Sequence, residues 1–526
     1  MKYIYNIIKA DYLQRTRSYA FLITLAVTVF MAYSFVPAND AGYTTLSASG
    51  YKGVYNSAWV GYVSGIMTTV MLSFYGFMLV NSGIKKDIDT EVGMIIATTP
   101  ISNFKYLLSK QLSNYLVLLS ITGITFIVSI GVFFWRGNGY PFVLSNFILP
   151  YLFFAVPALF VVSSLAVVSE VFLGKRSLLQ AIAYFFLCGI CMALINVKDG
   201  ANHNGFFDPF GLSLITKSIT QHINTNYNES LKGVSFGFIF NGIKTYRLFT
   251  WEGLNWSNLF IVSRLLWVAF GFAIVYLSSL FFHRFDLKQV ASVKKIKKEP
   301  LIINSTQLKS NAAAINWSSL PPLNFDYGIF SFFKTELLLL VRQGNKWLWM
   351  LNAGLWIAMF LVPFSIAHVY LLPILLFLQV GRWSELVTKE KTHRIHYFAY
   401  ASYKPLQRML PAQILAGIAL ALILSLPILI RAVIIANGYV LLTVVNGVLL
   451  MVLVAVALGI LTGGKKMFEI LFFLLTYSVL NKVPFTDYLG ALPHQNKWNV
   501  GIAVLIINLL LVITAILARR YETRNL

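Results

Sequence analysis

Residues 440–461 read VLLTVVNGVLLMVLVAVALGIL, a run of 22 positions without a single charged side chain. An α-helix rises about 1.5 Å per residue, so about 20 mainly apolar residues cross the hydrocarbon core of a bilayer. This run therefore predicts a membrane-spanning helix. Runs of the same kind recur along the whole chain, and they decide its fold class.

The composition excludes a chain of several soluble domains. Hydrophobic residues make up 58% of the 526 positions and charged residues 12%, with a mean hydropathy of +0.71. In soluble domains about 45–50% of residues are hydrophobic and about 25% are charged. The two cysteines lie in one apolar run, so no disulfide framework is expected. The first apolar run lacks a small-residue cleavage site, which argues against a cleaved signal peptide. We predict an all-α polytopic membrane protein.

Twelve apolar runs are long enough to be candidate spans. The seventh and eighth runs, at Leu355 and Ile374, are separated only by residues 363–368, so they form either a tight hairpin or a re-entrant element. The count could therefore be ten or eleven instead of twelve. The twelve runs are centred near Thr28, Met71, Thr122, Leu159, Leu187, Phe270, Leu355, Ile374, Ile418, Leu449, Leu474 and Ile507.

The charge distribution predicts the orientation. The 42 basic and 19 acidic residues give a net charge of +23, which without a soluble domain indicates cytoplasmic loops beside anionic lipid and not nucleic-acid binding. With the N-terminus inside, the inner segments hold 30 basic residues and the outer segments 10. This excess predicts that both termini are cytoplasmic, in a protein of the cytoplasmic (inner) membrane.

The connectors between spans repeat in the same order, which predicts two six-helix halves at residues 1–286 and 331–526. Each half opens with an amphipathic basic segment, at 7–19 and 330–347, and has a tight basic turn before its fifth span, at 174–176 and 464–466. Six spans per half make the repeats parallel. Residues 287–330, with their run of lysines and Pro321-Pro322, are predicted to be a cytoplasmic linker.

The loop after the second span, residues 82–111, has the most informative pattern. Acidic residues precede Gly93, a short apolar turn follows at 94–97, and Pro100 ends it because proline disfavours helix at the preceding residue. Ser102 is a candidate cap for the next helix. This short helical segment is too short to span the membrane, and we predict that it lies along the inner face as a rigid projection. An ordinary solvated loop is the alternative.

This loop resembles the one after the second span of ABC-2 type transporter permeases. The resemblance implies a coupling helix that docks on a nucleotide-binding subunit. Ser109 stands where that family has glycine, and the second-half counterpart at 382–408 lacks both the glycine and the Thr-Pro step. The residues implied in coupling are Asp89, Glu91, Gly93, Met94, Ile95, Ala97, Thr98, Thr99, Pro100 and Lys110, and in the second half Glu390, His393 and His396.

The resemblance also implies partners. The chain's nearest approach to a phosphate-binding loop is at 459–466, where Lys466 replaces the Ser or Thr that would hold magnesium, so we interpret it as a membrane turn. No cofactor is expected on this chain. ATP and magnesium are expected in separate ABC ATPase subunits, two copies per permease. The other expected partners are membrane lipids and a small amphipathic or hydrophobic substrate, exported from the cell.

The largest outer loop spans residues 197–257. In the family that it resembles, short helices here cap the pore and re-enter the membrane, and the apolar stretches 206–211 and 234–240 fit that role; a plain outer loop fits equally. Arg264, about two turns inside the sixth span, is a functional candidate or snorkels outward. The candidate gate or pathway residues are Phe207, Asp208, Phe210 and Arg264.

Other patterns carry little chemistry. Cys188 and Cys191 have metal or redox spacing, but in an apolar span they are expected to pack as small residues. His393 and His396 would share one helical face but lack a third zinc ligand. Glu170 is expected to pair with Lys175, and Glu336 with Arg342. No metal site follows from these residues.

Two other functions remain open at this stage. An ion-coupled secondary transporter would need ionisable groups at mid-membrane, and the spans contain almost none. A membrane enzyme acting on lipid intermediates would draw on outer-loop residues without recognisable spacing, namely His203, Asp208, His222 and Glu252. The leading hypothesis is the permease subunit of an ABC exporter.

Overall fold

The computed structural model describes residues 2–38, 41–48, 50–137, 139–174, 177–195, 208–228, 231, 233–239, 246–282, 328–344, 346–480, 486–492 and 497–524. Phe207, Lys175, His203 and all but the last three residues of the predicted linker lie outside these ranges.

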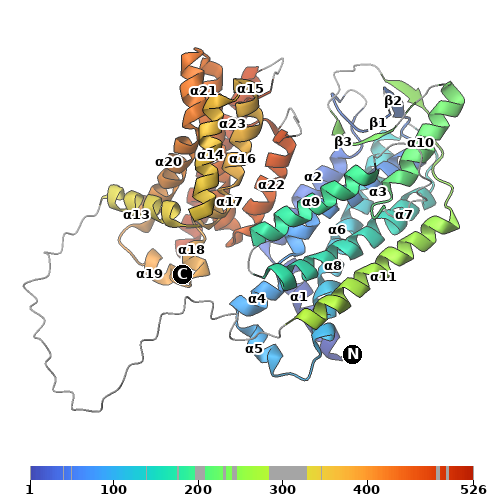
Figure 1. Ribbon diagram of the computed structural model, residues 1–526, viewed down its shortest axis with the longest axis horizontal. Helices are drawn as coiled ribbons and strands as arrows, with labels where there is room; N and C mark the ends of the chain where they lie inside the picture. Colours follow the sequence, from blue (N-terminus) through green and yellow to red (C-terminus); the bar gives the residue numbers. More distant parts are fainter. Residues whose placement is uncertain are drawn as a thin grey trace, which may run out of the picture.

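Helices form almost all of the described part of the first half (Figure 1). A π-helical turn, η1, joins α7 to α8 directly, so these three form one continuous rod. The helices are α1 (Lys2–Thr16), α2 (Tyr19–Ser34), α3 (Ser57–Val80), α4 (Gly83–Asp89), α5 (Val92–Ala97), α6 (Asn103–Arg136), α7 (Ser145–Pro150), η1 (Tyr151–Ala155), α8 (Val156–Leu173), α9 (Ser177–Ile195), α10 (Leu212–Tyr227) and α11 (Asn258–Phe281).

The second half is helical as well, with more breaks. Its helices are α13 (Ile329–Arg342), α14 (Lys346–Leu361), α15 (Phe364–Ile366), η3 (Ala367–Leu371), α16 (Leu372–Phe377), α17 (Val380–Glu385), α18 (Lys389–Thr392), α19 (His396–Tyr400), α20 (Pro405–Ile434), α21 (Gly438–Thr462), α22 (Lys466–Leu480) and α23 (Lys497–Arg524).

Every one of the twelve predicted span centres falls within a helix. Among the described residues, seven helices are long and apolar enough to cross a membrane; α1 and α2, bent by 70° at their junction, add an eighth only if the two form one span. This confirms a multi-pass helical membrane protein. The helices at Leu187, Leu355, Ile374 and Leu474 are shorter, so twelve spans stay a prediction. Pro363 separates α14 from α15, and α14 packs against η3 and α16, an arrangement common to the tight-hairpin and re-entrant alternatives.

The buried side chains form two main hydrophobic cores, one in each half. The first contains buried residues from Phe21 to Phe260 and a single residue of the second half, Ile470, whereas the second runs from Leu340 to Ala515. The order of helix contacts also repeats: α1 packs on α6 as α13 packs on α20, and α8 packs on α11 as α21 packs on α23. Two internally packed halves are what a duplicated architecture requires.

The halves meet along α22, which packs against α3. Aromatic rings form part of this joint: Phe74 stacks on Tyr477 with ring centroids 5.7 Å apart, and Phe185 meets Phe473 edge-on at 5.3 Å. At the end of the joint nearest α4, called the inner end after its predicted orientation, the Lys466 ammonium donates a hydrogen bond to the Asn81 carbonyl. The two cores are therefore joined by ring contacts with a polar contact at one end.

Four short strands were missed by the sequence analysis. β1 (Thr44–Ser47) pairs antiparallel with β3 (Ser235–Ile239), and β2 (Tyr51–Gly53) pairs parallel with β4 (Arg247–Phe249). The interpretation of 234–240 as a re-entrant helix was wrong, because most of that segment is β3. The strands and α10 lie at the opposite end from α4, α5, α18, α19 and both termini (Figure 1).

Close packing at Gly447 predicts a stability effect. A Cβ atom there would lie 2.3 Å from the Tyr488 carbonyl oxygen, whereas one at Gly123 would have no neighbour within 4 Å. Gly447→Ala should therefore lower the free energy of unfolding by about 1–3 kcal/mol through overpacking. Gly123→Ala, the matched control, should be neutral or stabilising by up to about 1 kcal/mol. Thermal unfolding in detergent measures both, and equal melting temperatures would contradict the packing at Gly447.

Candidate functional site

The inner loop after α3 is held by one buried carboxylate. Both side-chain oxygens of Glu170, on α8, accept two backbone hydrogen bonds each, from Ser82 and Gly83 (2.7 and 2.9 Å) and from Ile84 and Lys85 (2.8 and 3.0 Å). These are the N–H groups that a helix leaves without internal partners at its first turn. The expected pairing with Lys175 lies outside the described residues. The four backbone contacts give Glu170 a structural role in holding this loop.

A buried ion cluster fixes the same loop from the other side. The Lys110 ammonium lies 2.8 Å from Asp11 on α1 and 2.7 Å from Asp87 on α4, and the Tyr106 hydroxyl donates to Asp87 at 2.7 Å. Lys110 is only 2% exposed. The family resemblance implied a role for Lys110 in coupling to a partner, but from its buried position Lys110 cannot touch one. It ties α1, α4 and α6 together instead.

Helix α5 is the exposed part of this loop. Its Ile95 side chain is 68% exposed and Met94 44%, whereas Gly93 is buried and Ile96 packs inward. The predicted end of the turn and the predicted cap are confirmed, since α5 ends at Ala97 and the Ser102 hydroxyl accepts from the Lys105 N–H to cap α6; α5 begins at Val92, two residues before the predicted 94. The remaining predicted residues lie around it, with Asp89, Glu91, Thr98 and Pro100 exposed and Ala97 and Thr99 half-buried.

The second-half loop is also held by ion pairs, which are partly buried. Lys389 forms an ion pair with Glu336 on α13, which corrects the expected pairing of Glu336 with Arg342. Lys391 pairs with Glu522 on α23, and Glu522 also lies 2.9 Å from Arg519. These pairs tie the loop to helices at both ends of the second half, because α13 begins it and α23 ends it.

Glu390 is buried inside this loop. Its Oε1 accepts a hydrogen bond from the Gln413 amide at 2.8 Å, while its Oε2 and the Gln413 carbonyl oxygen have no hydrogen-bond partner. Burial raises the pKa of the Glu390 carboxyl, although the nearby Lys389 ammonium opposes this shift. Glu390 was predicted as a coupling residue, and the structure places it where it cannot contact a docked partner.

The expectation that His393 and His396 share one helical face was wrong. His393 follows α18 and His396 begins α19, and between them Arg394 has a φ of +57°, which breaks the helix. No group of three possible metal ligands occurs among the residues that the structure describes. The turn exposes His393 and Arg394, and beside them the large side chains Ile395, Tyr397 and Phe398, the last 84% exposed.

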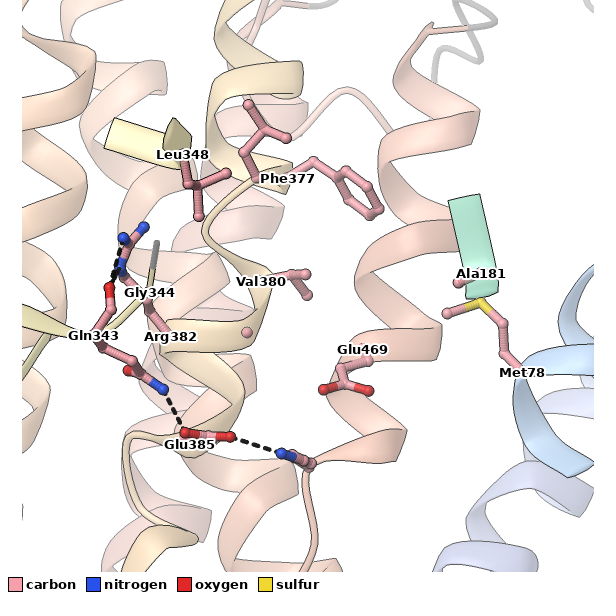
Figure 2. A pocket seen from close by; sticks show the side chains of 13 residues that line it. Met78, Ala181, Gln343, Gly344, Leu348, Phe377, Val380, Arg382, Glu385 and Glu469 are labelled. Atoms are coloured by element: carbon pink, nitrogen blue, oxygen red, sulfur yellow. Dashed lines mark hydrogen bonds and ion pairs between the residues drawn. The ribbon is translucent and has the colours of Figure 1, made fainter. Parts of the chain in front are cut away.

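A cavity of about 220 Å³ lies between the two halves at the inner end of their joint. Met78 and Ala181 line it from the first half, and Phe377, Leu348 and Val380 from the second, as Figure 2 shows. Its polar wall carries Glu385, which lies 2.6 Å from Lys465 and accepts a hydrogen bond from Gln343. Glu469 projects into the same space (Figure 2). The cavity is therefore amphipathic.

The predicted gate residues form an anchored turn at the outer end. Asp208 accepts from the backbone N–H groups of Phe210, Gly211 and Ser213, at 2.9, 2.8 and 2.6 Å. Arg264 is buried and donates to the carbonyl oxygens of Asp208 and Pro209, so it does not snorkel to the surface. Asp208, Phe210 and Arg264 thus hold the start of α10 on α11.

The second half has the same turn, which the sequence analysis missed. Asp487 accepts from the N–H groups of Ala491 and Leu492 at 2.9 and 2.8 Å, and Gly490 has a φ of +66°, as Gly211 has +80°. Both segments read Asp-x-x-Gly before the sixth span of their half. That shared spacing was the signal available in the sequence, and it was hidden because the surrounding outer loops differ greatly in length.

The remaining candidate residues lie apart. Cys188 is buried and Cys191 half-buried in α9, both as free thiols. Glu252 is exposed and His222 half-buried, and the His222 ring contacts Asn226. The glycines at 459–464 end α21 and turn into α22, so this segment joins two helices and does not follow a strand as a phosphate-binding loop does.

The ion cluster at Lys110 predicts a large stability effect. Lys110→Met would leave Asp11 and Asp87 buried without their cation, which should cost about 3–5 kcal/mol. Lys105→Met, one turn earlier on the exposed side of α6, is the matched control and should cost little. Melting in detergent measures the loss, and limited proteolysis should detect faster cleavage within residues 82–101. Equal stability of the two variants would contradict the cluster's role.

The buried Glu390 carboxyl predicts a pH dependence. Because the pKa of this carboxyl is raised in the folded state, its charged form lowers the stability of the fold. This loss of stability is absent below the ordinary Glu pKa of 4.5. It develops as the pH rises through the folded-state pKa, and above that pKa it is constant. The Glu390→Gln variant should therefore have a higher melting temperature than the wild-type protein near neutral pH. The difference in melting temperature should vanish on acidification. The exposed Glu91→Gln is the control, and a pH-independent difference would contradict the assignment.

Comparison with models of known protein families, with curated proteins and with solved structures finds no match for this chain. The function proposed below therefore rests on the residues, contacts and charges of the chain itself.

Proposed function

We propose that this chain is the membrane-spanning permease subunit of an ATP-driven exporter of the ABC-2 type. The observation that carries this proposal is the form of α5: a short helix with apolar side chains exposed at one end of the molecule, on a base that buried polar contacts fix to the spans. Exposed apolar groups on a rigid support are typical of a protein interface.

The contacts of the loop would transmit a force from α5 into the membrane. Glu170 links α4 to α8, and Lys110 links α4 to α1 and α6. A partner that displaces α5 therefore moves three helices of the first half together, because separating any of them would strand a buried charge. In the second half, Lys389 and Lys391 link the exposed loop to α13 and α23 in the same way.

Two exposed surfaces at the same end fit two ATPase subunits. The first surface is α5, and the second is the turn from Ile395 to Phe398 (Figure 1). ATP and magnesium would be bound by those subunits. This end is cytoplasmic in our proposal, in agreement with the excess of basic residues in its loops, so both termini are cytoplasmic and the protein lies in the cytoplasmic membrane.

The cavity between the halves fits the substrate class. It has apolar walls at Met78 and Phe377 and charged groups at Glu385, Lys465 and Glu469. A small amphipathic molecule would bury its apolar part against the former and place its polar part near the latter. The cavity lies at the joint, where rocking of one half against the other would change its access.

The proposal is tested by docking variants. Detergent-solubilised protein from the native host should carry a polypeptide with ATP-binding motifs, in two copies by native mass spectrometry. Ile95→Asp should weaken ATPase binding at the first surface at least about ten-fold, since a buried isoleucine contributes about 1.5–3 kcal/mol. Ile95→Asp with Phe398→Asp should release both copies.

Tyr5→Asp is the matched control, because Tyr5 on α1 is 62% exposed yet belongs to neither surface. It should retain both copies. Wild-type protein that never carries an ATPase would refute the proposed function, whereas ATPase binding that survives the double substitution would refute these two surfaces as the docking sites.

A further inference from the structure

The outward face of α13 combines large apolar side chains with positive charge. Phe330, Leu338, Leu339 and Val341 are exposed, Phe330 by 72%. Lys334 and Arg342 are exposed too, one helical turn on each side of Leu338. A helical face of this composition is typical of a helix that lies in the interface of a bilayer.

No exposed acidic group opposes that charge on α13. The only acidic residue of the helix, Glu336, is 6% exposed and faces inward, where it pairs with Lys389. The exposed charges of α13 are therefore all positive. A surface with this pattern is complementary to anionic headgroups, which attract basic residues near a membrane.

The position of α13 agrees with the plane of a bilayer. It packs against α20 and lies across the axes of α14 and α20 at the inner end of the second half (Figure 1). Directly after it, the exposed Lys346 and the 73% exposed Trp347 begin the apolar helix α14. Tryptophan is enriched at the interface between hydrocarbon and water, so α13 stands at the depth of the headgroups.

Helix α1, which occupies the same place in the first half, has a different face. From residue 4 onward, its exposed residues are Tyr5, Asn6, Lys9, Ala10 and Gln14, and Tyr5 is the one large apolar group exposed among them. This part of α1 therefore lacks the apolar area that would draw it into the interface. This contrast supplies an internal control within the same chain.

We propose that α13 binds the anionic phospholipid surface of the leaflet at the inner end, and that α1 does not. The apolar residues enter the interface, while Lys334, Arg342 and Lys346 contact phosphate groups of anionic lipids. The inference does not depend on the proposed transport function. It makes the second half the lipid-sensing half of the molecule.

Site-specific fluorescence quenching tests this assignment. In a Cys188→Ser/Cys191→Ser background, Leu338→Cys carries a fluorophore, and the full chain is reconstituted in phosphatidylcholine vesicles containing about one quarter phosphatidylglycerol. Either lipid is brominated in turn, at the same molar fraction. The label should be quenched by both, and more strongly by brominated phosphatidylglycerol. Tyr5→Cys carries the matched label on α1 and should show no preference.

Charge removal separates the electrostatic from the apolar contribution. Lys334→Gln with Arg342→Gln should reduce the preference for brominated phosphatidylglycerol about five-fold per removed charge, while quenching by brominated phosphatidylcholine persists. Lys9→Gln should leave the preference unchanged. An unquenched label at 338 would mean that α13 faces water or a soluble partner, and would overturn the proposal. Equal quenching of this label by both brominated lipids would overturn it as well. So would a label on α1 that prefers brominated phosphatidylglycerol as strongly as the label at 338 does.

Discussion

A chain that crosses hydrocarbon must satisfy its own backbone hydrogen bonds, because no water is there to do so. Helices meet this requirement within one segment, and the long described helices of this protein follow from it. The strands β1 to β4 are short and lie at one end, opposite the inner loops. The inner loops face the same constraint wherever they are buried, and there the chain uses side chains: Glu170 takes four backbone N–H groups that α4 cannot satisfy internally.

The helical fold could be predicted from apolar runs alone, since each run marks a helix at its centre. The number of crossings could not, because α9, α14 and α22 are too short to be assigned by length. The strands were missed because β1 and β3 are nearly two hundred residues apart in the sequence, and their pairing leaves no local signal. The Asp-x-x-Gly turns were visible in the sequence, but their similarity became clear only when Asp208 and Asp487 were each seen to accept from the backbone N–H five residues further on, in Ser213 and Leu492.

The inner loop shows where sequence reasoning succeeds and where it stops. Local chemistry fixed the boundaries of α5, because Pro100 and the Ser102 cap act on their immediate neighbours. Burial is decided by distant residues, and so Lys110 and Glu390 were assigned to a docking surface although both lie inside. In a chain with many basic residues, each acidic residue has several possible ion-pair partners. Glu336 pairs with Lys389 and not with Arg342 because of how α13 packs against its neighbours, which the sequence does not show.

The joint between the halves has a mechanical consequence. Ring contacts such as Phe74 with Tyr477 have little directional preference compared with hydrogen bonds, so the two surfaces can slide over one another at small cost. The Lys466 contact with Asn81 lies at one end of the joint only. Each half is rigid, the ring contacts allow the halves to slide, and the Lys466–Asn81 hydrogen bond holds one end of the joint. Relative movement of the halves is therefore largest at the opposite end.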